Sequence, residues 1–267
     1  MTTGRDFNFR TPLLDCFKRG EVDRETRMLA AAGDLAPRAQ EQLAILIYLM
    51  DDPDQEIQAV AEQTLDQIPL DRLASFLARA DVSQDLRAAF ARRGIEPAAT
   101  ASSDPDTPLI DRAPAEPPPD EAATPEQRRQ SVTQRISRMS ITDRVKTAMK
   151  GTREERTVLI RDPNKLVASA VLSSPKLSES EVESIAKMAS VSDEVLRIIG
   201  TNRTWIRHYA VIAALARNPK TPVAVALNLV SRLNDRDVRM LSVDRNVAEP
   251  IRLAARRLAV ASQLRRT

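Results

Sequence analysis

Apolar residues recur at helical spacing along most of the chain. In "DDPDQEIQAVAEQTL" (51–65), four apolar positions fall on one face of a helix: Ile57, Val60, Ala61 and Leu65. Polar and charged residues occupy the positions between them. This pattern predicts an amphipathic helix with one buried side.

An Asp-Pro pair precedes that helix and recurs later in the chain. Asp52 precedes Pro53, and Asp162 precedes Pro163 in "RDPNKLVASAVL". An aspartate carboxylate accepts from free N–H groups in the first turn of a helix, and proline is favoured at the first helical position. Both pairs therefore predict helix starts, with Asp52 and Asp162 as N-caps.

The stretch before Asp52 predicts a second helix that ends at the same turn. Together, "RAQEQLAILIYLMDD" (38–52) and the helix after Pro53 form an antiparallel hairpin. This hairpin resembles a HEAT repeat, although HEAT motifs usually carry an Arg where this chain has Gln58. Residues 70–94 predict a further helical pair that Gly94 ends.

The C-terminal part repeats helix-start signals. Thr152 with Glu155, and Ser178 with Glu181, have the spacing of capping boxes. Cycles of short, medium and long helices begin near residues 152, 192 and 235, a period of about 40 residues. This period resembles armadillo repeats and their bacterial HEAT-like and leucine-rich-variant relatives. The resemblance implies an all-α chain built as an α-solenoid of stacked helices.

A proline-rich segment divides the predicted helical regions. Residues 96–125 contain eight prolines, seven acids and one base, without helical or alternating periodicity. This composition is typical of an extended, disordered linker. We therefore expect a HEAT-like domain at 1–95, a linker at 96–125 and an armadillo/HEAT-like domain at 126–267. The apolar "TPLIDR" (107–112) leaves open a docking motif within the linker.

Charge is distributed unevenly between the two parts. Residues 1–125 carry a net charge of −10 and residues 126–267 carry +13. Basic residues crowd 128–150 and the last helix, so nucleic acid is a possible partner of the C-terminal domain. Aromatic residues make up only 3% of the chain, which argues against stacking on single-stranded bases.

The sequence shows no catalytic, cofactor-binding or metal-binding constellation. One His and one Cys cannot make the usual zinc site, and no glycine-rich phosphate loop occurs. The helix start "TNRTWIRHY" instead groups four candidate partner-binding residues: Arg203, Trp205, Arg207 and His208. Tryptophan and arginine are common in binding hot spots. A packing role remains the alternative for Trp205 and His208.

These observations favour a non-enzymatic scaffold or adaptor that binds a protein partner through helical-repeat surfaces. The alternatives are a nucleic-acid-binding protein and, third, an enzyme or chromophore-handling factor built on such repeats. No cofactor or small-molecule substrate is indicated. The single cysteine and the absence of an apolar leader or spanning stretch predict a cytoplasmic protein without membrane insertion.

Overall fold

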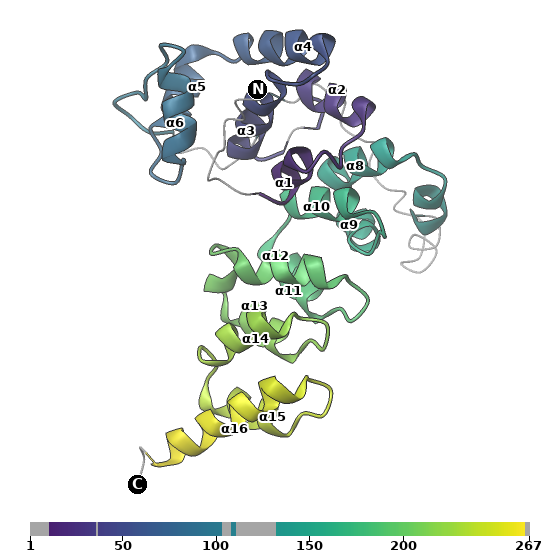
Figure 1. Cartoon of the computed structure of the whole chain (residues 1–267), viewed down its shortest axis with the longest axis vertical. Coiled ribbons are helices and arrows are strands. Elements are labelled where there is room, and N and C mark those ends of the chain that lie inside the picture. Colours follow the sequence, from purple (N-terminus) through teal and green to yellow (C-terminus); the bar gives the residue numbers. More distant parts are fainter. Residues whose placement is uncertain (1–10, 36, 103–107, 111–131, 265–267) are drawn as a thin grey trace, which may run out of the picture. The chain divides into compact units, whose positions relative to one another are not determined.

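The chain is all-α in the computed structural model, which describes residues 11–35, 37–102, 108–110 and 132–264, with side chains to residue 261 (Figure 1). No strand occurs in these ranges. The contacts divide the chain into two compact units, Met1–Lys176 (unit 1) and Leu177–Thr267 (unit 2).

Unit 1 consists of short helices joined by tight turns. Residues 132–137 are also helical. The other helices are α1 (Pro12–Lys18), α2 (Arg24–Ala32), α3 (Ala39–Leu49), α4 (Gln55–Asp66), α5 (Leu70–Leu77), α6 (Gln84–Ala91), α8 (Ile141–Lys150), α9 (Arg153–Leu159) and α10 (Lys165–Ser173).

The core of unit 1 joins helices that are distant in the sequence. α3 contacts both α2 and α4, as the predicted hairpin of α3 and α4 requires. α1 packs against both α3 and α10. α8 and α9 contact α10, so α8–α10 belong with the N-terminal helices. The predicted stripe of α4 is confirmed at Ile57, Ala61 and Leu65, which are buried.

The two Asp-Pro pairs build the same turn, but the predicted N-caps are wrong. The N-cap of α4 is Asp54 rather than Asp52, and the N-cap of α10 is Asn164 rather than Asp162. Each first aspartate instead accepts from the N–H two residues later, at 2.9 Å for Asp52 and 2.8 Å for Asp162. Both turns therefore stabilise the residue that caps the helix.

Each buried first aspartate also has an arginine partner two helices earlier. Arg27 of α2 donates to both carboxylate oxygens of Asp52, at 2.9 and 2.8 Å. Arg144 of α8 donates to Asp162 at 2.6 Å. Both aspartate side chains are at least 94% buried, where an unpaired charge would be costly. The arginines explain why these positions carry a charge although they are not caps.

Unit 2 contains a series of helical hairpins. Its helices are α11 (Glu179–Lys187), α12 (Asp193–Thr201), α13 (Tyr209–Arg217), α14 (Val223–Val230), α15 (Asp235–Val243) and α16 (Glu249–Leu264), with a 3-10 turn η1 (Trp205–Arg207) before α13.

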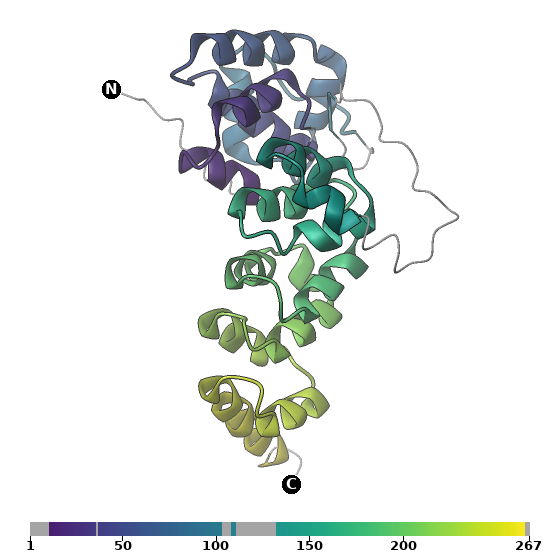
Figure 2. The same ribbon diagram turned by 90° about the vertical axis from the view of Figure 1, so that its right-hand side faces the viewer.

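The helices of unit 2 form two rows. α11, α13 and α15 contact one another in succession, and so do α12, α14 and α16 (Figure 2). α11, α12 and α13 each also contact the next helix in the chain, and α15 contacts α16. The observed repeat is thus a pair of helices, with first helices starting at 179, 209 and 235. This grouping differs from the predicted three-helix cycle of about 40 residues, because start signals recur at every helix and do not show which helices pack together.

Several local predictions are confirmed. Both capping boxes are present, with Thr152–Glu155 at α9 and Ser178–Glu181 at α11. Gly94 follows α6 with φ +77°, a left-handed conformation that ends the helical pair.

The sequence also predicts that Thr221 caps a helix starting at Pro222 and that Gly200 ends a helix, and both of these predictions are wrong. Thr221 does not cap α14, since Pro222 is the N-cap and the buried Thr221 hydroxyl has no hydrogen-bond partner among the described residues. Gly200 does not end α12, which continues to Thr201. A Cβ at Gly200 would clash with Cγ1 of Val225. This glycine therefore permits close packing of α12 against α14.

Two pieces of the predicted linker contact helices of unit 1. The N–H groups of Ala98 and Ser102 donate to carbonyls of α5, each at 2.9 Å. Residues 108–110 also lie against unit 1, as described below. The rest of the predicted linker, 103–107 and 111–125, lies outside the described residues. Independent folding of 1–95 and 126–267 stays a prediction, although the contacts group residues 141–176 with the N-terminal helices.

Candidate functional sites

The four residues predicted to bind a partner lie at the turn between α12 and α13. Arg203 and Arg207 are exposed and form no ion pair in the described part of the chain. His208 contacts Glu179 of α11, with Nε2 and Oε1 2.8 Å apart. Both side chains of this pair are more than one-third exposed, so the contact contributes little to stability.

Trp205 is mostly enclosed within unit 2. Its exposed fraction is 5%, and it begins the 3-10 turn η1 rather than a long α-helix. The Asn202 side chain accepts from the backbone N–H of Thr204 and of Trp205 and fixes this turn. Trp205 therefore offers a partner little surface, while the neighbouring arginines remain accessible. The partner-binding role of these residues stays a prediction.

Part of the predicted basic surface is used inside unit 1. Arg135 pairs with the buried Glu155, and Arg144 pairs with Asp162. Arg128 and Arg129 lie outside the described residues. When charge is counted by unit, residues 1–176 carry −3 and residues 177–267 carry +6. The basic surplus of the chain therefore belongs to unit 2.

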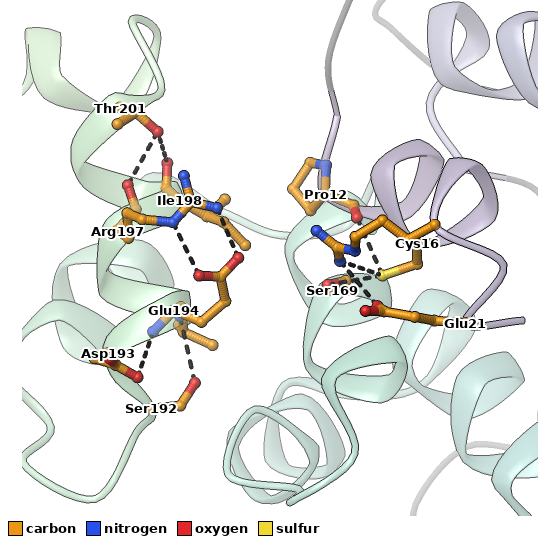
Figure 3. A network of polar contacts seen from close by, with 12 residues as sticks. Pro12, Cys16, Glu21, Ser169, Ser192, Asp193, Glu194, Arg197, Ile198 and Thr201 are labelled. Carbon is orange, nitrogen blue, oxygen red and sulfur yellow. Dashed lines mark hydrogen bonds and ion pairs between the residues drawn. The ribbon is translucent and has the colours of Figure 1, made fainter.

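The one cysteine has the environment of a packing residue (Figure 3). Cys16 is fully buried, and its thiol donates to the carbonyl of Pro12 and contacts the Ser169 hydroxyl at 3.6 Å. Burial raises the pKa of the Cys16 thiol, while contacts with Ser169 and Arg19 oppose that rise. A protonated, enclosed thiol is a poor nucleophile.

The paired acids of the first helical turns have structural partners. Asp193 accepts from the backbone N–H of Glu194, and Glu194 pairs with Arg197 (Figure 3). No cluster of three metal-binding side chains occurs among the described residues. Within the same ranges, every helix is too short or too polar to cross a lipid bilayer.

A buried glutamate joins three helices of unit 1. Glu41 of α3 accepts from the N–H groups of Leu13 and Leu14 in α1, at 3.2 and 3.3 Å, and from the Ser173 hydroxyl of α10 at 3.1 Å. Burial raises the pKa of Glu41 to about 7, although these donors and Thr11 favour the charged form. Glu41 is thus a titratable contact between the N-terminal helices and α10.

A second polar contact holds residues 108–110 against unit 1. The Gln42 amide oxygen accepts from the N–H groups of Leu109 and Ile110, at 2.8 and 3.1 Å, and its NH2 donates to the Ile110 carbonyl at 2.6 Å. Arg72 donates to the carbonyls of Leu109 and Pro108, at 3.0 and 3.5 Å. Every backbone polar group of this tripeptide therefore has a partner.

The apolar side chains of the tripeptide are buried or half-buried. Leu109 has an exposed fraction of 7%. Ile110 lies over Gly33, where an added Cβ would be 2.9 Å from its Cγ2, and the Thr64 methyl borders the same space. We call Gly33, Gln42, Thr64 and Arg72 the Gln42–Arg72 site. It draws on α3, α4, α5 and the residue that ends α2.

The sequence contains only a partial signal for this site. "TPLIDR" is the one apolar stretch in the predicted linker, and it indicates a possible docking motif. The sequence does not single out Gln42, because a polar residue in the predicted helix 39–49 is expected to be exposed unless the tertiary structure shows otherwise.

No protein-family model matches this chain, and neither a curated protein nor a solved structure matches it.

Proposed function

We propose that this chain is a non-enzymatic scaffold or adaptor that binds short segments of protein partners. The observation that carries the proposal is the Gln42–Arg72 site, which holds a tripeptide by all its backbone polar groups. Backbone binding of this kind recognises a main-chain conformation, here a bend at Leu109, and the two adjacent apolar side chains supply selectivity.

The architecture supports the same function. The paired helices of unit 2, together with the hairpin of α3 and α4, favour an α-solenoid of HEAT/armadillo-like repeats. Such stacks offer long surfaces on which partners bind. The candidate reactive groups of the described chain, Cys16 and Glu41, are both buried in contacts between helices. These features favour binding over catalysis and fit a cytoplasmic adaptor.

A displayed peptide library tests the proposed function on the full-length chain. We expect selection to enrich peptides with adjacent branched aliphatic residues. Arg72→Ala should lose most of this enrichment, because two carbonyl contacts disappear. Arg92→Ala is the matched control, since among the described residues the Arg92 side chain bonds only to the carbonyl of Ala88 on its own helix. Enrichment that is absent, or equal on both variants, would contradict peptide binding at this site.

Nucleic-acid binding through unit 2 is the second candidate function. Its support is the net charge of +6 and the exposed, unpaired Arg203 and Arg207 among the described residues of this unit. Phosphate groups would contact these guanidinium groups and release counterions.

Charge reversal at the two arginines tests this alternative. If unit 2 binds duplex DNA, Arg203→Glu with Arg207→Glu should weaken binding about tenfold or more. The plot of log affinity against log salt concentration should also become less steep, by roughly 0.9 for each lost phosphate contact. Fluorescence anisotropy with a labelled duplex at several salt concentrations measures both. Arg153→Glu with Lys165→Glu makes the same charge change in unit 1. Equal losses in the two variants would indicate only a general charge effect.

A further inference from the structure

We infer that residues 108–110 act as an internal competitor, occupying the Gln42–Arg72 site until a segment of a partner protein with similar chemistry displaces them. The inference rests on the proposed function and adds its regulation. It assigns the site one class of ligand, a short peptide that bends at two adjacent branched aliphatic residues.

The contacts resemble those of a bound ligand more than those of a structural loop. The site uses side-chain groups to hold the main chain, with Gln42 alone satisfying three backbone groups. Gln42 is 2% exposed with residues 108–110 in place, and its amide makes three hydrogen bonds to this segment. Without the segment, these amide groups would bond to water or to another peptide that bends in the same way.

The occupant is attached through a segment suited to exchange. It belongs to the proline-rich, acidic stretch 96–125, whose composition cannot form a core of its own. Only Leu109 and Ile110 supply branched aliphatic side chains in that stretch. Because the tripeptide is attached to the same chain, its effective concentration at the site is on the order of millimolar. Weak ligands would not displace it, whereas ligands that bind more tightly would.

The side chains that line the site define the ligand further. Gly33 leaves room for a branched aliphatic residue, which Ile110 fills. Arg72 is exposed and donates to carbonyls at the proline side of the segment. Acidic residues flank the tripeptide in the sequence, at Asp106 and Asp111. A partner segment with the same apolar pair would make the same backbone contacts.

The test uses a fluorescent peptide with the sequence of residues 107–112 and the full-length chain. Leu109→Asp should release the internal segment, because the enclosed apolar position rejects a carboxylate. We expect this variant to bind the peptide about tenfold more tightly than the wild type, from the lost internal competition. Adding Arg72→Ala to Leu109→Asp should remove that gain. Leu227→Asp, at an exposed position of unit 2, is the control and should behave as the wild type.

Three results would overturn the inference. Equal peptide binding by the wild type and the released variant would show that the internal segment does not compete, while leaving peptide binding itself intact. No binding by the released variant would contradict peptide recognition at this site. A wild-type dimer that Leu109→Asp converts to a monomer, measured by light scattering, would assign the segment to exchange between two copies. If Leu109→Asp lowers the helicity, Ile110→Asp replaces it in the same measurements.

Discussion

Leu215→Asp is expected to unfold unit 2. Leu215 lies in α13 and is fully buried, and Val211 and Ile212 of the same helix are also buried. An unpaired carboxylate at this position costs several kcal/mol, a large part of the stability of a domain of this size. Because α13 contacts α11, α14 and α15, the damage should spread along both rows of helices. A circular dichroism melt and amide hydrogen exchange measure the loss.

The control for this variant makes the same Leu-to-Asp substitution at an exposed leucine. Leu227→Asp places the same substitution in the neighbouring α14, where the leucine is 38% exposed. It should alter the melting temperature little. Amide protection that survives Leu215→Asp throughout residues 177–261 would show that the buried stripe of α13 does not hold unit 2 together.

The stability of unit 1 is expected to fall as the pH rises toward neutrality, through Glu41. In the folded chain the pKa of Glu41 is about 7, against 4.5 for the ordinary glutamate value. The folded state therefore binds an additional proton between these two pH values, so the free energy of unfolding decreases as pH increases. The full effect, reached above about pH 7, is about 3 kcal/mol, at roughly 1.4 kcal/mol for each pKa unit.

Glu41→Gln isolates this effect. The glutamine oxygen can accept the same three hydrogen bonds, which all go to Oε1 of Glu41. The variant should lose the decrease in stability between pH 4.5 and 7 and be the more stable protein at pH 8. Denaturant unfolding at several pH values measures the difference, with the exposed Glu96→Gln as the control. Parallel pH profiles for wild type and Glu41→Gln would place the titration of Glu41 outside this range.

The helices follow from local sequence, because caps and apolar stripes act within a few residues. The capping boxes at Thr152 and Ser178 depend only on side chains three residues apart, and both form as predicted. The stripe of α13 needs only helical periodicity to reveal its buried face. The all-α class and most helix positions can therefore be predicted from the sequence.

The sites depend on contacts between distant residues, which no local pattern records. Asp52 and Asp162 look like caps, but they pair with Arg27 and Arg144 from helices two elements earlier. The sequence around Trp205 predicts a partner-binding residue, but in the folded chain the Trp205 side chain is buried.

The Gln42–Arg72 site shows the same division most clearly. The sequence identified the apolar stretch around Leu109 as unusual for a linker. Only the tertiary structure brings Gln42, 67 residues away, to its backbone. Local interactions thus determined which residues are helical, while packing decided which polar groups are buried, and a buried polar group must find its partner wherever the fold provides one.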